Sequence, residues 1–228
     1  MDSEGRLTKS KRNTTSQELP VRRENERSLR ILAAAEALFS QNAYEAVSIR
    51  DIADKAEVNS ALIRHHFGTK DQLYRGLFER RYHSITQRRI EMVGALRIVP
   101  NSIETVTSIV ENWVGPLLKM ASDPNSRNFV NLLARESSDA SKDRHGIIAE
   151  YLDPSAKVCI GALRRALPDV RPNSITQAYL WMIATAMSTI IDQDRVGRLA
   201  GRGTSKPAEC LKDLVTFVSN GLMAIGRK

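Results

Sequence analysis

The residues with the clearest chemical meaning lie together in residues 48–70, which read SIRDIADKAEVNSALIRHHFGTK. At about 100° of rotation per residue, Ile63 and Phe67 share one face of a helix, and this face must point into the protein core. The opposite face is centred on Ala61 and His65, so it presents small and hydrogen-bonding groups. A face of this kind suits close approach to base edges in the major groove of DNA.

Nine residues of this segment are candidates for contacts with double-stranded DNA. Small side chains in the first turn allow the helix to approach the bases, and Leu62 can contact a thymine methyl group. Cationic and hydrogen-bonding side chains suit a guanine edge or phosphate oxygens. Lys70 and the N–H groups at the start of its helix form an anion site for which a duplex phosphate is the natural occupant. The full set is Arg50, Ser60, Ala61, Leu62, Arg64, His65, His66, Thr69 and Lys70.

Capping residues predict how this segment folds. Ser48 followed by Asp51 resembles a capping box and opens a first short helix. Asn59 is a strong N-cap for a second short helix, and Val58 and Ile63 have the spacing of a hydrophobic staple. Two short helices joined by a tight turn and braced by a preceding helix describe a helix-turn-helix.

Residues 27–78 resemble the DNA-binding domain of the TetR family of bacterial transcriptional repressors. The matching residues are Ile31-Leu32-Ala33-Ala34-Ala35, Leu38-Phe39, Tyr44, Ser48-Ile49-Arg50-Asp51-Ile52-Ala53, Ala56, Val58, Ala61-Leu62-Ile63, His66-Phe67, Lys70 and Leu73. The resemblance implies a homodimer in which three N-terminal helices bind operator DNA. It also implies a helical C-terminal domain that binds a small molecule and dimerises through its last two helices. In similar proteins, ligand binding changes the spacing of the two DNA heads and releases the operator.

Three positions depart from the family pattern. The family often has Gly where this chain has Ala43 and Glu57, so those turns must form without the freedom of Gly at φ > 0. The family often has Tyr where Arg64 stands, and this position therefore reads a different base or adds a phosphate contact.

Helical spacing dominates the chain and predicts an all-α fold. From Glu24 onward, apolar residues recur at i, i+3, i+4 and i+7, and period-2 alternation is almost absent. Gly197, Gly201 and Gly203 mark a final loop. We expect about nine helices in total. Those after the helix-turn-helix cover Lys70 to about Val93, a stretch ending near Met120, a stretch ending near Ser137, Lys142–Leu167 with a kink or division at Pro154, Ala178–Ile191 and Lys206–Ile225.

Three regions follow from this pattern. We expect a flexible basic arm over residues 1–23, a three-helix DNA-binding head over residues 24–70, and a helical sensing and dimerisation domain over residues 71–228. The arm's cations, Lys9, Lys11, Arg12, Arg22 and Arg23, can follow a DNA minor groove, and a merely solvated tail is an equal alternative.

Two sets of apolar residues in the C-terminal region are candidate sites. The stretch Ala178–Ile191 is apolar nearly all round, which fits either burial under a second copy of the protein or a central place in the core. The dimer candidates are Met182, Ile183, Ile190, Leu211, Leu214, Val218 and Leu222. The candidates for an effector cavity, whose spacing is also typical of plain core, are Trp113, Leu117, Met120, Phe129, Trp181 and Met187.

The composition is that of a globular protein with excess positive charge. Of 228 residues, 42% are hydrophobic, and 34 Lys and Arg against 26 Asp and Glu give a formal net charge of +8. Two cysteines, Cys159 and Cys210, are too few for a disulfide framework and indicate a reducing compartment. We expect a cytoplasmic protein, because neither a secretory signal nor an apolar run long enough to span a membrane is evident.

Enzymatic and metal chemistry are not indicated. There is no nucleophile–base pair, carboxylate dyad or cofactor loop, so we expect neither an enzyme nor a bound cofactor. His65 and His66 point about 100° apart on a helix without further ligands nearby, which argues against a metal site. We predict a homodimeric DNA-binding regulator, a repressor released from its operator by a small and apolar effector. The alternatives are a ligand-independent or architectural DNA-binding protein, an activator, and a helical adaptor that does not bind DNA.

Overall fold

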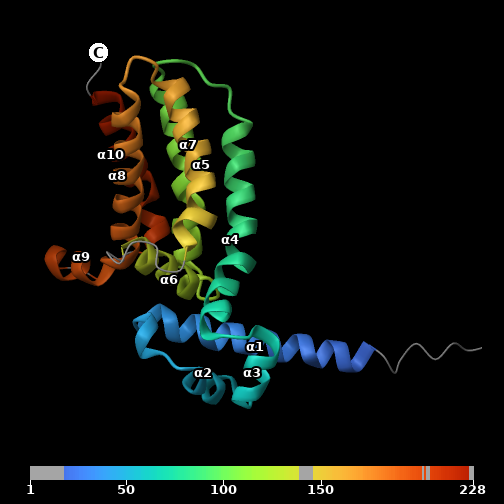
Figure 1. Ribbon diagram of the computed structural model, residues 1–228. Helices are drawn as coiled ribbons and strands as arrows, with labels where there is room; N and C mark the ends of the chain where they lie inside the picture. Colours follow the sequence, from blue (N-terminus) through green and yellow to red (C-terminus); the bar gives the residue numbers. More distant parts are fainter. Residues whose placement is uncertain (1–17, 139–145, 202, 204–205, 226–228) are drawn as a thin grey trace, which may run out of the picture.

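The computed structural model of the protein describes residues 18–138, 146–201, 203 and 206–225. Within these residues the chain forms ten α-helices and three short helical turns and has no β-strand, which confirms the predicted all-α fold. Three helices form a small head, and the others form a longer bundle that stands on it (Figure 1).

The head consists of α1 (Glu18–Gln41), α2 (Ile49–Ala56) and α3 (Ser60–Phe67), with a single 3-10 turn, η1 (Tyr44–Ala46), between the first two helices. Helix α1 begins at Glu18, earlier than the predicted start at Glu24, and therefore contains Arg22 and Arg23 of the predicted arm. Lys9, Lys11 and Arg12 lie outside the described residues. The core of the head is formed by completely buried Ile31, Ile52 and Ile63, one from each helix.

One helix, α4 (Lys70–Gly94), belongs to both parts of the molecule. Its first turns pack against the head, where the rings of Tyr74 and Phe39 meet edge-on with their centroids 4.9 Å apart. Its later turns run along the bundle beside α5 and α7. The hydrophobic core is therefore continuous from the head into the bundle.

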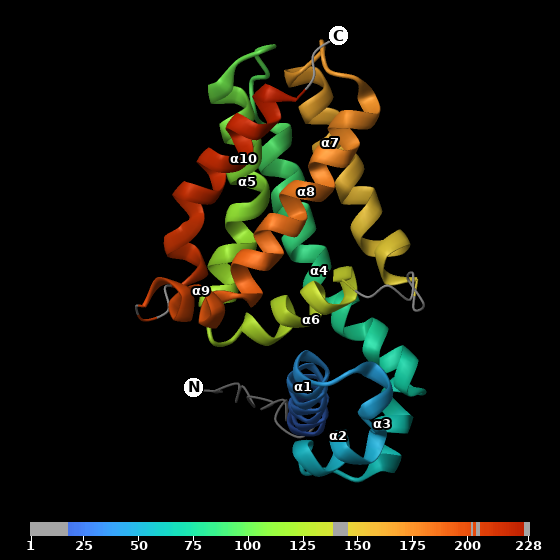
Figure 2. The same cartoon turned by 90° about the vertical axis from the view of Figure 1, so that its left-hand side faces the viewer.

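The bundle is organised around a central helix. Helix α5 contacts α4, α6, α7, α8 and α10, and Figure 2 shows α8 and α10 together on one face. Helix α6 lies across the lower end of the bundle and packs on α1, which adds a second connection to the head. The bounds are α5 (Ile103–Ser122), α6 (Arg127–Ser138), α7 (Asp153–Ala166), α8 (Pro172–Ile191), α9 (Gln193–Ala200) and α10 (Leu211–Ala224).

Several boundaries differ from those predicted. Pro154 stands in the first turn of α7, where its missing N–H costs little, and a π-helical turn, η2 (Ile148–Leu152), precedes it. The predicted division at Pro154 is thus confirmed, and the predicted start at Lys142 lies outside the described residues. Helix α9 occupies part of the predicted final loop, because a helix can accommodate Gly197 and ends only at Gly201, whose φ of 63° is left-handed. This helix raises the count from about nine to ten.

Helix α8 is longer than predicted, because Pro172 is accepted in its first turn. An 18-residue window within its 20 residues has a mean hydropathy of 1.2, so by length and composition alone the helix is able to cross a membrane. In the fold it packs against α5, α6, α7 and α10, and it buries Ile175, Met182 and Ala186. Part of its apolar composition is thus accounted for by the core of the bundle.

Candidate functional site

Helix α2 begins with the predicted capping box. The backbone N–H of Ser48 donates to Oδ2 of Asp51 at 2.8 Å, and the backbone N–H of Asp51 donates to Oγ of Ser48 at 3.1 Å. Hydrogen bonds from Ser48 lower the pKa of the Asp51 carboxyl below its ordinary value. The box fixes the start of the helix and leaves Arg50 exposed in its first turn.

The turn between α2 and α3 is made by a residue with positive φ. Glu57 has φ 54° and ψ 48°, and its N–H bonds back to the end of α2. The prediction for this turn is confirmed, because Glu57, a residue with a Cβ atom, takes the left-handed conformation that Gly often supplies in the family. Ala43, the other position where the family often has Gly, has φ −59° and ψ 148°, so the first turn needs no such conformation.

Helix α3 has the predicted orientation. Asn59 caps it by accepting the N–H of Ala61 on its Oδ1 at 2.8 Å. Ile63 is completely buried and Phe67 is half-buried against the core, whereas Ala61, Arg64 and His65 are exposed. The half-buried members of the predicted set on this helix are Ser60, Leu62 and His66.

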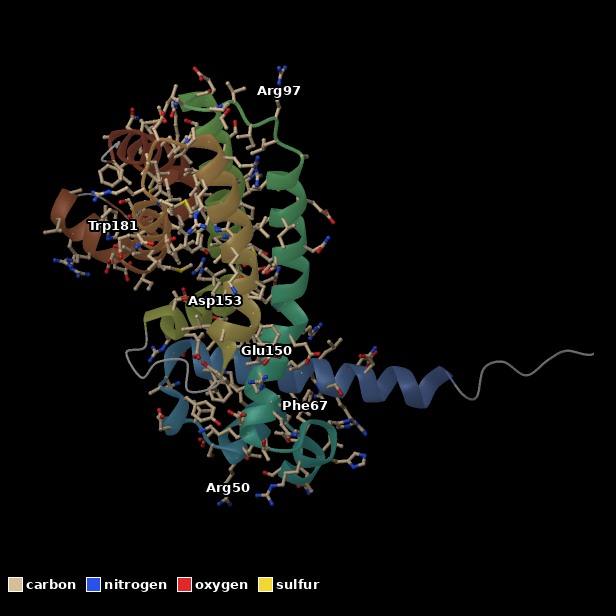
Figure 3. The ribbon with its side chains drawn as sticks, turned by 45° about the horizontal axis from the view of Figure 1, so that its top comes forward. Arg50, Phe67, Arg97, Glu150, Asp153 and Trp181 are labelled. Carbon is tan, nitrogen blue, oxygen red and sulfur yellow. The ribbon has the colours of Figure 1, made fainter. Side chains whose placement is uncertain are left out.

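Helix α3 lies in the head, at the end of the molecule away from most of the bundle (Figure 1). Arg50, at the start of the neighbouring helix, also points away from the bundle there (Figure 3). The side chains on the exposed face of α3 are small at its first turn and cationic or hydrogen-bonding at its last turn. A short helix with this profile at a free end is able to enter a major groove.

Lys70 has partners within the protein. Its ammonium donates to the backbone carbonyl of Tyr44 and lies 4.1 Å from the centroid of the Tyr44 ring. Partial burial lowers the pKa of Lys70 below its ordinary value, although the nearby carboxylates of Glu45 and Asp51 oppose this. An ammonium has three donors, so hydrogen-bonding capacity remains for a phosphate. The pairing with Tyr44 was missed in the sequence, because the two residues are 26 positions apart.

The start of α4 is closed by a second capping box. The N–H of Thr69 donates to Oε1 of Gln72 at 2.8 Å, and the N–H of Gln72 donates to Oγ1 of Thr69 at 3.2 Å. Two backbone donors at this helix end are thus taken up within the box. Thr69 itself is exposed, so its hydroxyl group remains accessible.

The bundle contains a cavity of about 500 Å³ between α6, η2, α7 and α8. Its wall is largely apolar, and it also includes the carboxylates of Asp153 and Asp192. The apolar residues of the wall include Leu152, Ala156, Tyr179, Ile183 and Met187. Of the six effector candidates, only Met187 lines it. Trp113, Leu117 and Phe129 are buried in the core and Met120 is half-buried, whereas Trp181 is 57% exposed on the outer side of α8 (Figure 3).

A shallow apolar groove runs between α8 and α10 on the outer face of the bundle. Trp181 and Phe217, which are 57% and 72% exposed, stand along it, and neither was among the dimer candidates. Among those candidates, Met182, Val218 and Leu222 line the groove as buried residues, and Leu214 and Ile190 are buried without lining it. Ile183 lines the cavity on the other side of α8, and Leu211 is half-buried.

Polar contacts connect the bundle to the head. The Tyr74 hydroxyl on α4 donates to Oε2 of buried Glu136 on α6 at 2.7 Å. Glu36 on α1 forms an ion pair of 3.1 Å with Nε of Arg81 on α4. Ser137, which lines the cavity, directly follows Glu136 in the chain. The cavity wall is therefore one residue from the hydrogen bond between Glu136 and Tyr74 of α4.

Comparisons with known protein families agree with this geometry. The head matches the family model described as bacterial regulatory proteins of the tetR family over residues 31–77. A second model, described as the tetracyclin repressor-like C-terminal domain, matches residues 111–221.

Individual relatives are similar in part or in fold. An HTH-type transcriptional repressor of Mycobacterium tuberculosis is 48% identical over 60 residues, which are 26% of this chain and only 31% of that protein. The fatty acid degradation regulator FadR of Bacillus halodurans has a TM-score of 0.63 at 12% identity, over 86% of this chain and 96% of that chain. FadR of Bacillus subtilis, solved with stearoyl-CoA, has a TM-score of 0.64 at 14% identity, over 85% and 98%.

Proposed function

Because the chain belongs to the TetR family of bacterial regulatory proteins, we propose that it is a homodimeric repressor that binds operator DNA and is released by a small-molecule effector. The observation that carries this proposal is the orientation of α3. Its apolar side is closed by Ile63, and its exposed side offers Ala61, Arg64 and His65 at the free end of the head.

The DNA contacts divide into two kinds. Arg64 and the small residues of the first turn of α3 face the bases, where side-chain identity determines sequence preference. Arg50, His65, His66, Thr69 and Lys70 bind phosphate oxygens and fix the position of the head on the duplex. Two heads of a symmetric dimer then occupy successive major grooves about 34–36 Å apart on a pseudo-palindromic site.

The groove between α8 and α10 is the dimer interface of this proposal. Exposed Trp181 and Phe217 are large aromatic side chains of the kind that anchor protein interfaces. A second copy placed on the same groove by a twofold axis covers both, and the interface is then self-complementary.

The cavity between α6, η2, α7 and α8 is the effector site of this proposal. Its apolar wall favours a largely apolar molecule. A regulator of similar fold from Bacillus subtilis was solved with stearoyl-CoA, which supports an effector with a long apolar part. Movement of the wall at Ser137 reaches α4 through Glu136 and Tyr74, and α4 carries the head.

The test is a comparison of DNA sequences at matched salt. Fluorescence anisotropy measures binding to a duplex from the region upstream of the protein's own gene and to a shuffled duplex of equal composition. We expect the upstream duplex to bind at least about 10³-fold more tightly, as is typical of specific regulators. Equal affinities would identify an architectural DNA-binding protein, and absence of binding to both would identify a helical adaptor.

A pair of variants locates the contact. Ala61→Glu places a bulky anion on the exposed face of α3, and we expect it to abolish binding. Arg97→Gln makes the same change in net charge at the opposite end of the molecule (Figure 3) and leaves binding intact. Equal losses in both variants would show that net charge, and not the face of α3, determines binding.

A further inference from the structure

Arg89 is a buried cation for which the described residues supply no counter-ion. It lies on α4 inside the bundle and is 3% exposed, and its Nε and Nη2 atoms have no hydrogen-bond partner. Among the described residues, no carboxylate forms an ion pair with it. Its guanidinium carbon lies 3.9 Å from the centroid of the Trp113 ring.

An arrangement of this kind is costly for the protein. Burial lowers the pKa of Arg89, but an arginine remains protonated in proteins, so the charge persists inside the bundle. A stacked aromatic ring offsets part of the lost hydration and supplies no hydrogen-bond acceptor. Buried charges are normally paired or bound to a ligand, and a polar group left unpaired at a defined place is typical of a functional site.

One residue of the effector cavity wall, Tyr179, is close to the guanidinium. Tyr179 lines the cavity and also packs edge-on against Trp113, with ring centroids 6.4 Å apart. The charge of Arg89 acts on both the Tyr179 hydroxyl and the Cys159 thiol, and Cys159 follows the cavity residue Ala156 by three positions on α7. Tyr179 is therefore close to both the cavity and the unpaired cation.

We infer that the effector is an apolar molecule bearing a single carboxylate, which pairs with Arg89 while the apolar part occupies the cavity. This inference rests on the proposed sensing function and names the class of ligand. The carboxylate accepts two N–H groups of the guanidinium side by side, which supplies the partners that Nε and Nη2 lack. One negative charge neutralises one arginine, whereas a phosphate dianion leaves an excess charge in an apolar surrounding.

The side chains on two sides of the guanidinium differ in how they are held. Tyr82 also interacts electrostatically with Arg89. Its hydroxyl is already bonded to Oγ of Ser155 at 2.8 Å, and Ser155 donates in turn to the Leu152 carbonyl, so Tyr82 is held in place. The inference requires the Tyr179 side chain, which lines the cavity, to move so that a carboxylate reaches Arg89. A ligand bound at Arg89 acts directly on α4, the helix that carries the head.

The experiment compares carboxylates with alcohols of the same length on the full-length protein. Octanoate and dodecanoate are titrated against octanol and dodecanol, with binding measured by calorimetry and by the shift of the unfolding temperature. We expect the carboxylates to bind the wild type roughly ten- to a hundred-fold more tightly than the alcohols, the range for hydrogen bonds to a charged group. If no carboxylate binds better than its alcohol, the inference is overturned.

Variants identify the arginine. Arg89→Met, of similar length, abolishes the preference for carboxylates and raises the unfolding temperature of the ligand-free protein, because the unpaired charge is removed. Arg88→Met, one position along α4 and exposed, retains the preference and serves as the matched control. Retention of the preference in Arg89→Met, or a lowered unfolding temperature of that variant, would instead assign Arg89 a structural role over Trp113.

Two further measurements complete the test. Arg89→Lys keeps a buried charge, and we expect it to retain a reduced preference, which provides a readout should the Met variant fail to fold. Binding of the upstream duplex is measured for every variant in the absence of carboxylate. Loss of the carboxylate preference with DNA binding intact separates this inference from the proposed function, and absence of DNA binding in the wild type would overturn only the latter.

Discussion

Lys70 makes contacts within the protein and is also proposed to bind a DNA phosphate. The sequence identifies it as a cation at a helix start, which is a local pattern. Its hydrogen bond to the Tyr44 carbonyl and its contact with the Tyr44 ring depend on how the turn after α1 packs against α4. Residue spacing within one helix does not predict such a tertiary contact. The ammonium is therefore already oriented before DNA binds, which reduces the entropy lost on forming a phosphate contact.

We predict different effects for the two cations of the head. Lys70→Ala weakens binding to the upstream and shuffled duplexes alike and lowers the slope of log affinity against log salt by about 1, because one phosphate contact is lost.

Arg64→Ala weakens binding to the upstream duplex by about 1–3 kcal/mol and relaxes the preference at one base pair. Anisotropy titrations at several salt concentrations measure both. An unchanged salt slope for Lys70→Ala would remove this residue from the phosphate contacts.

Glu57 gives a prediction about stability. Its φ of 54° is strained for a residue with a Cβ atom, and its side chain is exposed. Glu57→Gly should raise the free energy of unfolding by about 1 kcal/mol, while Glu57→Ala, which keeps a Cβ atom, should give no such gain. Urea denaturation measures the difference. Equal stabilities of the two variants would indicate that the turn is not strained at this position.

At the scale of elements, caps and periodicity predicted the helix-turn-helix well, because each signal lies within a few residues of the boundary it determines. The bundle was predicted less well. Gly197 and Pro172 read as helix-breaking residues in the sequence, yet α9 continues through the first and α8 begins at the second. Both outcomes depend on position within the helix, since a first turn accepts proline and a packed helix tolerates one glycine.

The contact between α1 and α4 has a measurable dependence on pH. Burial raises the pKa of Glu36 above its ordinary value of 4.5, although the charges of Arg81 and Arg80 oppose this. The folded state therefore retains a proton that the unfolded state releases, and the free energy of unfolding falls as the pH rises from 4.5 through the folded pKa. Glu36→Gln, which does not titrate, should lack this component. Denaturation across the acidic pH range measures it, and parallel curves for the two proteins would contradict it.

At the scale of the whole molecule, the sequence predicted which helices form the proposed interface and missed which of their residues are exposed. Apolar residues surround α8, so periodicity did not distinguish its inner side from its outer side. The fold separates them, because Met182 faces the bundle and Trp181 faces outward. The same limit applies to Arg89, whose lack of a counter-ion depends on all the helices that pack around it.

We expect Phe217→Asp to convert the dimer into a folded monomer with weakened DNA binding. Phe217 is 72% exposed in the single chain, so the substitution leaves the core intact and places a charge in the groove. Leu199→Asp on α9, at 78% exposure and outside the groove, is the control and should remain dimeric. Sedimentation equilibrium gives the mass of each protein. Persistence of the Phe217→Asp dimer would place the interface elsewhere.

The continuity of α4 has a mechanical consequence. Lys70 and Arg89 stand on the same unbroken helix, and its rise of about 1.5 Å per residue puts them about 28 Å apart. A tilt of about 5° at one end of a rod of this length moves the other end by about 2.5 Å, close to the length of a hydrogen bond. A small tilt of α4 near Arg89 therefore moves Lys70 and the head by a larger distance, because one continuous helix connects them. In the proposed function, the head is the part that must match the spacing of the two DNA grooves.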